Sequence, residues 1–340
     1  MTRQRRRTPT ARNARGKLRR SVFGLLTAAA ASILIVLSCH AASSQAARTV
    51  KIVVPVPPGG AGDILARQLA EQVGHAQGAT IVTENRPGAG TVIGTESVAR
   101  APADGNTLLL NAPYMLISPQ LRKVNYDPLR SFEPVCYLVS SPGVIVVNSA
   151  SPYRTLADLI DAARAKPGEL TLASVGPGTA QHIGFEMLKR AANVDLTYVP
   201  YAGGAPAINA LLGGHVTAVF AEYAPLAGHL KGGTLRALAT SAKTRIEPLP
   251  NLPTVAESGY PDYEVDLWWG LFAPAQTPKQ VLSQLTRWFT DALGAPEVKA
   301  KLNAQGFSAV AMCGADFATL LRKQFDDYGR VIRAANIRAE

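Results

Sequence analysis

The chain has 340 residues, which is long for one domain and sufficient for two. Its formal net charge is +11, but nine of its 35 basic residues lie within residues 1–20, and residues 1–47 contain no Asp or Glu. The remaining 26 basic residues stand against 24 acidic ones, so the body of the protein is nearly neutral. A nearly neutral body lacks the basic surface of a nucleic-acid-binding protein, and we expect no nucleic-acid partner.

Residues 1–47 have the layout of a secretory signal peptide. A basic segment precedes an apolar run from Val22 to Leu37, and small residues around Ser44-Gln45-Ala46 offer a cleavage site. One alternative is an uncleaved membrane anchor, although the run is shorter than the ~20 residues that cross a bilayer comfortably. Another is a lipid anchor at Cys39, which ends an imperfect lipoprotein motif. We rank both below export, and we predict a periplasmic protein.

The first unit after this segment is a strand, a glycine loop and a helix. Residues 51–56 are rich in β-branched side chains, and apolar residues recur through 66–73 at the spacing of a helix with one buried face. The loop leads into a helix N-terminus, whose unpaired N–H groups and partial charge of about +0.5 attract anions. The alternative is a tight turn in which Asp63 caps the helix. The ligand-binding residues predicted here are Gly59, Gly60, Ala61 and Gly62.

Short apolar strands and amphipathic helices alternate along most of the remaining chain. Expected strands are 80–84, 107–110, 135–139, 144–147, 170–174, 196–200, 216–220 and 235–240, and expected helices are 91–100, 155–165, 179–191 and 205–212, with further long helices after residue 274. This alternation predicts an α/β fold in which each lobe is a mainly parallel sheet flanked by helices. We expect one lobe from residues 48–140 and 268–340 and the other from residues 141–267.

Glycine loops recur after strands in the second half of the chain. Ligands of parallel sheets bind beyond the carboxyl ends of the strands, so the loops there are candidate binding segments. Two lobes that each present a helix N-terminus suit a protein that closes on an anion. Beside the first loop, the predicted ligand-binding residues are Asn111, Ala112, Ser174, Gly178, Thr179, His182, Tyr201, Gly203, Ala221 and Glu222. For His182 we expect a role in holding its loop, and the alternative is a buried histidine that only packs.

Several short motifs occur in a fixed order. They are Pro58-Gly59-Gly60 with Asp63, Glu84 to Gly90, Ala103-Asp104-Gly105, Tyr126 to Leu129, Ser174 with His182, Val199-Pro200-Tyr201 and Leu252 to Val255. In these motifs the chain resembles the substrate-binding proteins of tripartite tricarboxylate transporters, the Bug or TctC-like family. The resemblance implies a type II periplasmic-binding fold whose two lobes close on a small organic carboxylate. It also implies delivery of that ligand to membrane transporter subunits, with no cofactor.

The chain departs from the family pattern at the end of strand 216–220, where Ala221-Glu222 replaces the usual Asp-Thr. Side chains alternate along a strand, so a strand that continues through this point should turn Glu222 away from the cleft. Ala221 would then leave an apolar wall that favours a carboxylate with an apolar or aromatic body. If the strand has already ended, Glu222 enters the cleft and accepts an ammonium group instead.

Three further questions concern catalysis, partners and the cysteines. An exported enzyme could use Ser174 and His182, but no G-x-S-x-G motif surrounds Ser174 and no metal motif occurs, so we expect a binding protein rather than an enzyme. A ligand-sensing partner of a membrane receptor would have the same fold and site. We expect a monomer. After signal removal only Cys136 and Cys313 remain, and we expect them to be unpaired, although pairing stays open.

Overall fold

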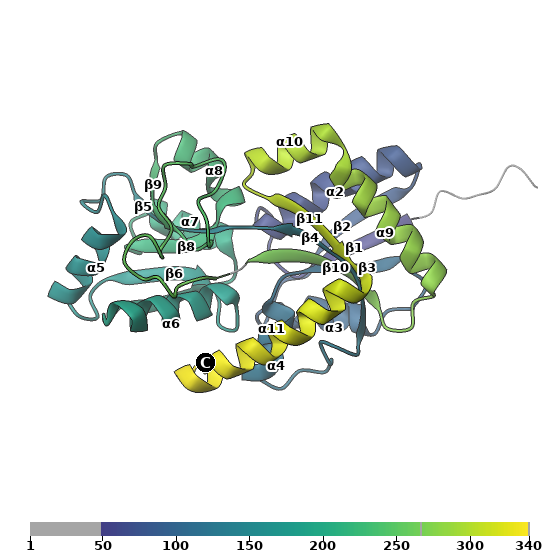
Figure 1. The fold of residues 1–340 in the computed structure, drawn as a ribbon, viewed down its shortest axis with the longest axis horizontal. Coiled ribbons are helices and arrows are strands. Elements are labelled where there is room, and N and C mark those ends of the chain that lie inside the picture. Colours follow the sequence, from purple (N-terminus) through teal and green to yellow (C-terminus); the bar gives the residue numbers. More distant parts are fainter. Residues whose placement is uncertain (1–48, 266, 339–340) are drawn as a thin grey trace, which may run out of the picture. The chain divides into compact units, whose positions relative to one another are not determined.

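The computed structural model describes residues 49–265 and 267–338. Within these residues, two mixed β-sheets flanked by helices form a two-lobed α/β fold (Figure 1). We call the part built on the six-stranded sheet the first lobe and the part built on the five-stranded sheet the second lobe. The predicted signal peptide lies outside the described residues. None of the helices in the described part of the chain has the length and apolar character needed to cross a membrane.

The first lobe has strands in the order β11-β4-β10-β3-β1-β2. The strands are β1 (Thr49–Val54), β2 (Thr80–Asn85), β3 (Thr107–Asn111), β4 (Phe132–Ser140), β10 (Trp268–Pro274) and β11 (Ser308–Cys313). The helices are α2 (Ala61–Gln77), α3 (Val92–Ala99), α4 (Tyr114–Leu121), α9 (Lys279–Gly294), α10 (Pro296–Ala304) and α11 (Gly314–Ala335). β1, β2 and β3 are parallel, and the other pairs are antiparallel.

The second lobe has strands in the order β7-β6-β8-β5-β9. The strands are β5 (Gly143–Asn148), β6 (Thr171–Val175), β7 (Thr197–Tyr201), β8 (Ala218–Glu222) and β9 (Leu235–Thr240), and the helices are α5 (Leu156–Ala165), α6 (Ala180–Ala192), α7 (Gly204–Leu212) and α8 (Tyr223–Lys231). β6, β7 and β8 are parallel, whereas β5 runs antiparallel to both of its neighbours. Each sheet is therefore mixed rather than mainly parallel, because strands that leave a lobe and strands that return to it run in opposite directions.

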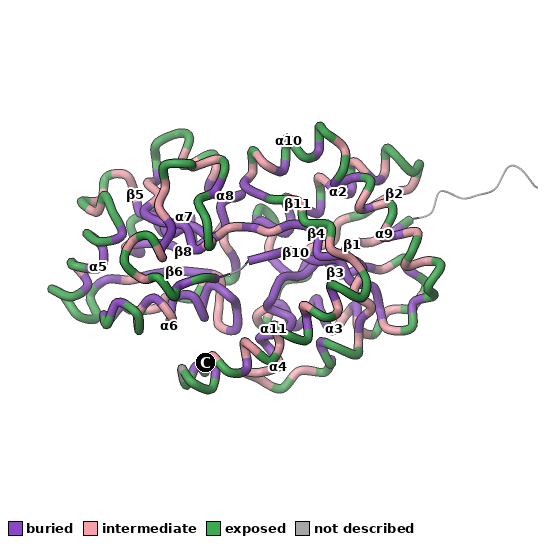
Figure 2. The backbone as a smooth tube through the Cα atoms, viewed as in Figure 1, coloured by how far each residue is buried: buried purple, intermediate pink, exposed green. Residues whose placement is uncertain are grey.

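The core lies between the sheets and their helices. Figure 2 shows buried residues concentrated along the strands and exposed ones along the outer sides of the helices. The apolar face predicted for the first helix packs as expected, with Ala66, Leu69 and Val73 buried in the core that includes β1. Thr155 and Asp158 form a capping box at the start of α5. The helices thus begin and pack where the sequence indicates, and the glycine loops lie between the strands and the helices that follow them.

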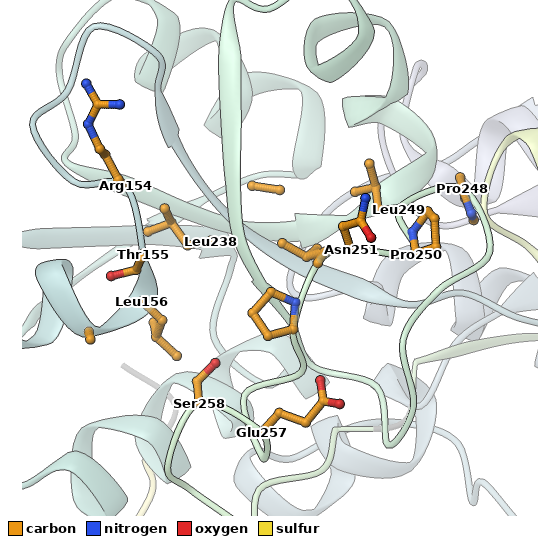
Figure 3. Close-up of a pocket in the computed structure, with 14 residues that line it drawn as sticks. Arg154, Thr155, Leu156, Leu238, Pro248, Leu249, Pro250, Asn251, Glu257 and Ser258 are labelled. Carbon is orange, nitrogen blue, oxygen red and sulfur yellow. The ribbon is translucent and has the colours of Figure 1, made fainter.

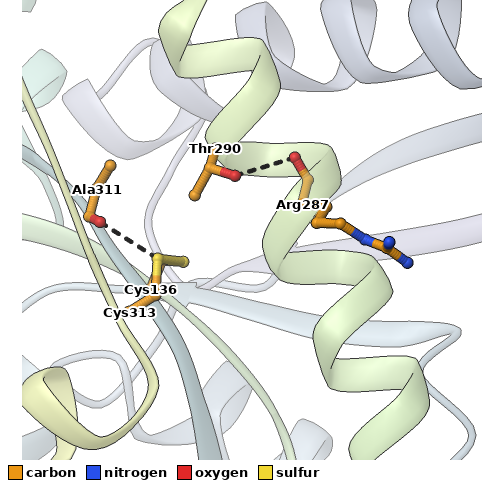
Figure 4. Close-up of a disulfide and its surroundings, with 5 residues drawn as sticks. All are labelled: Cys136, Arg287, Thr290, Ala311 and Cys313. Carbon is orange, nitrogen blue, oxygen red and sulfur yellow. Dashed lines mark hydrogen bonds between the residues drawn. A yellow bond between two sulfur atoms is a disulfide. The ribbon is translucent and has the colours of Figure 1, made fainter.

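Cys136 and Cys313 form a disulfide between β4 and β11 (Figure 4). The two residues are 177 positions apart in sequence, but β11 runs antiparallel to β4 with Cys313 directly opposite Cys136. α9, which contacts both strands, lies beside the bond. The expectation that these cysteines stay unpaired is wrong, because sequence separation did not reveal that the last strand returns to the side of β4.

Two segments cross between the lobes, and they are hydrogen-bonded to each other. The Ser141 N–H, just after β4, donates to Leu267 O at 2.7 Å, just before β10. On the second-lobe side, the Ser241 N–H donates to Gly143 O at 2.9 Å. These bonds fix the ends of β4, β5, β9 and β10 together, so residues that follow the nearby strands project into the space between the lobes.

Candidate ligand-binding site

The glycine loop of the first lobe is held by Asp63. α2 begins at Ala61 with Gly60 as its N-cap, so Asp63 is the third residue of the helix. The alternative in which Asp63 caps the helix is therefore wrong. The Asp63 carboxylate accepts hydrogen bonds from the Gly59 N–H and from Arg67 Nε, both at 3.0 Å. Burial alone would raise the pKa of Asp63, but the bonds from Arg67 and Gly59 outweigh it and lower that pKa. Asp63 therefore shapes the loop from inside the protein.

The space at the start of α2 is small. Gly60 and Ala61 line a cavity of 20 Å³ together with Gly203 and Glu222 from the second lobe. Such a volume holds about one water molecule. Gly62 is packed against Trp269, and a Cβ built on it would lie 2.4 Å from the indole ring. A carboxylate can occupy this position only if the two loops separate, so the anion site predicted at α2 stays a prediction.

The glycine loop of the second lobe precedes α6, and Thr179 is its N-cap. The Thr179 hydroxyl accepts from the His182 N–H at 3.2 Å, and its oxygen lies 2.6 Å from Val175 O and 2.9 Å from Gly176 O. This hydroxyl is therefore used within its own loop. The N–H groups of Ala180 and Gln181, also in the first turn of α6, have no acceptor inside the helix.

Ser174 and His182 both contact Tyr198. Ser174 Oγ lies 3.1 Å from the Tyr198 hydroxyl, and the His182 ring stacks on the Tyr198 ring with centroids 4.5 Å apart. Burial lowers the pKa of His182 to about 4, and its Nδ1 has no hydrogen-bond partner within the described residues. Tyr198 thus contacts both side chains, and no hydrogen bond between Ser174 and His182 is present in the described part of the chain.

The expectation that Ala221 lines the cleft and that Glu222 turns away from it is wrong. β8 does continue to Glu222, and its side chains do alternate. Ala221, however, is buried in the core beside Ile208 and Leu211 of α7, so it forms no part of a cleft wall. Glu222 points to the other side, where its Oε1 accepts from the Tyr114 hydroxyl of the first lobe at 3.3 Å. Alternation gave the relative orientation of the two residues correctly, but not which face meets the first lobe.

Glu222 is the acceptor for four side chains. Its Oε2 accepts from Ser141 Oγ at 2.5 Å and from Trp269 Nε1 at 2.7 Å, and its Oε1 accepts from Tyr114 and from Gln181 Nε2 at 3.5 Å. Burial raises the pKa of Glu222, and these hydrogen bonds only partly offset that effect. A carboxylate has about four lone-pair sites. The four donors occupy all four sites. Glu222 therefore has no free lone pair for a ligand ammonium, which the alternative prediction required.

A larger cavity lies between the lobes and beside the small one. We call it the cleft cavity; its volume is 280 Å³. Its walls are Pro55, Val56 and residues 88–91 from the first lobe and Val175 to Pro177, Thr179 and Pro200 to Ala202 from the second. Val56 and Val175 line both cavities. The cleft cavity has no charged side chain in its lining and is mainly apolar, so it suits the uncharged body of a small ligand.

The structure separates the predicted site residues into distinct groups. Thr179 and Tyr201 line the cleft cavity, and Gly60, Ala61, Gly203 and Glu222 line the small one. Gly59 and Gly178 lie where the lobes approach each other, beside Ala205 and Ser118 respectively, although neither is in the lining of the cleft cavity or of the small one. Asn111 is buried and bonds Thr95 Oγ1 and the Ala112 N–H, so Asn111 and Ala112 order the end of β3 instead of contacting either cavity.

Sequence reasoning missed several residues between the lobes. Tyr114, Gln181 and Trp269 donate to Glu222 or to one another. The loop 88–91, which lines the cleft cavity, was not missed as a segment, because it follows β2 at the sheet edge where binding loops were expected. The buried donors gave no signal, since an aromatic residue or glutamine in an apolar stretch does not reveal its partner.

A third cavity lies away from the cleft (Figure 3). It has a volume of 680 Å³ and is formed by the start of α5, from Arg154 to Ala157, and by residues 248–253 with Glu257 and Ser258. We call it the outer cavity. Its lining includes none of the predicted site residues. It therefore offers a direct alternative location against which binding in the cleft can be tested.

The two-lobed fold with a cavity between the lobes defines the class of two-lobed solute-binding proteins. The chain belongs to the tripartite tricarboxylate transporter family receptors, whose sequence profile matches residues 65–337. Protein BugT of Bordetella pertussis is 35% identical over 272 residues, which cover 79% of this chain and 83% of BugT. The family and the two-lobed α/β fold expected from the sequence are thus confirmed, with mixed sheets in place of mainly parallel ones.

Solved structures agree with this assignment. The periplasmic binding protein BugD superposes with a TM-score of 0.82 at 33% identity, covering 86% of this chain and 99% of BugD. A structure of Rpa4515 from R. palustris with adipate has a TM-score of 0.83 at 31% identity, covering 87% of this chain and 99% of that protein. The likeness therefore extends over both lobes.

Proposed function

We propose that this protein is exported to the periplasm, captures a small organic carboxylate between its lobes and delivers it to the membrane subunits of a tripartite tricarboxylate-type transporter. It acts as a monomer, with one lobe from residues 48–140 and 268–340 and the other from residues 141–267. The observation that carries the proposal is the 280 Å³ cleft cavity, which has walls from both lobes. Membership of the receptor family and the adipate in the related structure of Rpa4515 support it.

The carboxylate binds at the start of α6. The loop Val175 to Pro177 and Thr179 line the cleft cavity at this point, and the first-turn N–H groups of α6 point toward the helix start. The helix dipole adds an attraction that is worth about 0.3–1 kcal/mol at such a terminus. The rest of the ligand occupies the uncharged part of the cavity. No turnover is expected, because Ser174 and His182 each contact Tyr198 instead of each other.

Two leucine substitutions test this location. Gly176 lines the cleft cavity, and a Cβ built there would meet only Tyr201 O, at 3.4 Å, so Gly176→Leu fills the cavity without straining the loop. The matched control is Ala157→Leu, which fills part of the outer cavity at an exposed position of α5. We expect calorimetry with adipate and with propanoate to hexanoate to show binding that Gly176→Leu weakens at least tenfold, about 1.4 kcal/mol.

The control should bind like the unmodified protein. The reverse pattern, with binding lost in Ala157→Leu and kept in Gly176→Leu, would move the ligand to the outer cavity. Absence of binding to every carboxylate tested would contradict the proposed ligand class. Ligand recovered from the protein with a changed mass would contradict the assignment as a binding protein.

A further inference from the structure

The end of α4 holds the loop 88–91, which lines the cleft cavity. All residues of this loop have positive φ, and its non-glycine members keep such a backbone only where the surroundings enforce it. Ser118 Oγ, in α4, donates to Gly90 O at 3.0 Å. Arg122, the C-cap of α4, donates from Nη1 to Ala89 O at 3.5 Å. Neither side chain is in the lining of the cavity, so both support its first-lobe wall from behind.

Arg122 also reaches the second lobe. Its Nη2 donates at 3.4 Å to Pro177 O, in the loop between β6 and α6. The two loops meet at this point, because a Cβ built on Gly90 would lie only 3.0 Å from the same oxygen. Proline has no N–H group, so Pro177 offers only its carbonyl here. One guanidinium thus binds a carbonyl oxygen from each lobe, in the two loops that line the cleft cavity.

Gly178 allows the second-lobe loop to come this close. Its φ is 80°, which suits glycine, and a Cβ built there would already touch Arg122 Nη2 at 3.6 Å and Ser118 Oγ at 3.5 Å. The Arg122 guanidinium has no carboxylate partner within the described residues, and its buried Nε has no hydrogen-bond partner there. The positive charge of Arg122 is therefore directed at the two carbonyl oxygens.

The two bonds of Arg122 differ in what happens when the lobes separate. Ala89 and Arg122 belong to the same lobe, so their bond can persist. Pro177 belongs to the other lobe, so its bond to Arg122 must break. A distance of 3.4 Å is long for a hydrogen bond, and such a bond is weak enough to break and form again. Because the cleft cavity has walls from both lobes, a ligand inside it leaves when those walls part.

We propose that Arg122 is a latch for the cleft: its guanidinium holds the second-lobe loop against the first-lobe loop and slows the release of the bound carboxylate, without contacting the ligand. This inference rests on the proposed function and adds the residue that regulates release. The latch forms only after the ligand has entered, so it should change the dissociation rate constant and leave the association rate constant nearly unchanged. Arg122 is thus a positioning residue.

Three variants separate the latch from other roles of a cation. Arg122→Gln removes the charge and shortens the side chain, so the bond to Pro177 is lost. Arg122→Lys keeps the charge, but its single ammonium group lacks the planar fork with which a guanidinium binds two acceptors. Lys123→Gln is the matched control, because it removes the same charge from the exposed neighbouring residue.

Stopped-flow measurements on the full-length exported protein give both rate constants. The ligands are adipate and each monocarboxylate from propanoate to hexanoate that the unmodified protein binds. We expect Arg122→Gln to speed dissociation about fivefold, which corresponds to the loss of roughly one hydrogen bond. Arg122→Lys should fall between Arg122→Gln and the unmodified protein, and Lys123→Gln should match the unmodified protein. The factor should be the same for adipate and for the monocarboxylates, because the latch does not contact the ligand.

Several outcomes would overturn this inference and leave the proposed function intact. One is dissociation that stays unchanged in Arg122→Gln, or that Lys123→Gln accelerates equally. Another is a larger factor for adipate than for the monocarboxylates, or slower association in Arg122→Gln than in Lys123→Gln, because Arg122 would then act on the ligand directly. A lower melting temperature of Arg122→Gln without faster dissociation would give Arg122 a purely structural role.

If Arg122→Gln does not fold, Arg122→Lys decides by the same measurements. Its dissociation must then be faster than that of the unmodified protein, and an equal rate would overturn the inference. Failure of every carboxylate to bind the unmodified protein would overturn the proposed function and this inference with it.

Discussion

The Tyr114 hydroxyl of the first lobe donates to Glu222 Oε1 of the second lobe at 3.3 Å, and Gln181 Nε2 donates to the same hydroxyl at 2.9 Å. Trp269 of β10 adds a further bond to Glu222, at 2.7 Å. A buried carboxylate therefore collects donors from both lobes and from the segment that crosses between them. This cluster stabilises the arrangement in which the lobes meet around the cleft cavity.

Replacing the carboxylate should loosen this junction. Glu222→Gln places an NH₂ group where two donors now meet a carboxylate oxygen, so at least one buried donor loses its acceptor. We expect the free energy of unfolding to fall by about 1–3 kcal/mol, measured by urea denaturation. The matched control, Glu71→Gln, changes an exposed glutamate of α2 and should have little effect.

The same substitution tests ligand choice. All four lone-pair sites of Glu222 are occupied, so we expect glutamate and aspartate to bind more weakly than carboxylates without an ammonium group. Calorimetry decides between them. Tight binding of glutamate that disappears in Glu222→Gln would show that the ligand displaces a donor of the cluster, contrary to this account.

Asp63 should contribute to stability and not to binding. Asp63→Ala removes the acceptor for the Gly59 N–H, and we expect a loss of about 1 kcal/mol, comparable to that of a helix cap. The pKa of Asp63 is lowered in the folded protein. The stability that the ionised Asp63 contributes is therefore fully present when the pH is well above about 3.9, its pKa in the unfolded chain. That stability is lost as the pH falls below this value. Unfolding curves between pH 6 and pH 3 should show the difference between the two proteins shrink.

The outcome that contradicts this role is specific. If Asp63→Ala abolished carboxylate binding while its melting temperature stayed that of the unmodified protein, Asp63 would be a ligand contact. A stability difference that persisted undiminished at pH 3 would mean that the side chain acts through packing and not through its charge.

His182 should make the protein sensitive to mild acid. Its pKa is lowered to about 4 by burial, compared with about 6.5 in an unfolded chain, so the unfolded state takes up the proton first as the pH falls. Stability should therefore decrease between pH 6.5 and about pH 4, by up to about 1.4 kcal/mol for each pH unit. His182→Asn should flatten this part of the profile, whereas His75→Asn, at an exposed position of α2, should not. An unchanged slope in His182→Asn would place the titrating group elsewhere.

The disulfide between Cys136 and Cys313 should stabilise the first lobe. It closes a segment of 177 residues, and bonds that close long segments typically contribute 2–4 kcal/mol, mainly by restricting the unfolded chain. We expect the double variant Cys136→Ala with Cys313→Ser to unfold at correspondingly lower urea concentration. Reductant should lower the stability of the unmodified protein and leave the double variant unaffected. Thiol titration of the unreduced, unfolded mature protein that detects two free thiols would show that the bond does not form.

The sequence predicted what depends on neighbouring residues. The apolar spacing of Ala66, Leu69 and Val73 identified the buried face of α2, and the expected helix 155–165 coincides with α5. The glycine loops were found because glycine after a β-branched strand is a local signal. Each of these inferences rests on interactions within a few residues, whose geometry the backbone fixes.

What the sequence did not predict depends on contacts between distant segments. Alternation along β8 placed Ala221 and Glu222 on opposite faces, but only the packing of β8 against α7 decides which face is the core. The cysteine pairing depends on the return of β11 to β4. The narrowness of the space at Gly60 depends on the approach of Gly203, where a Cβ would lie 2.9 Å from Pro57. No local pattern encodes these distances.

The most direct measurement of the central claim is to identify the compound that co-purifies with the protein from the periplasm. Denaturing release followed by mass spectrometry should be applied to the unmodified protein, to Gly176→Leu and to Ala157→Leu. We predict a small carboxylate, chemically unchanged and close to one molecule per protein, in the unmodified protein and in Ala157→Leu, and its absence from Gly176→Leu. A bound compound without a carboxylate, or one that Gly176→Leu retains and Ala157→Leu loses, would contradict the account.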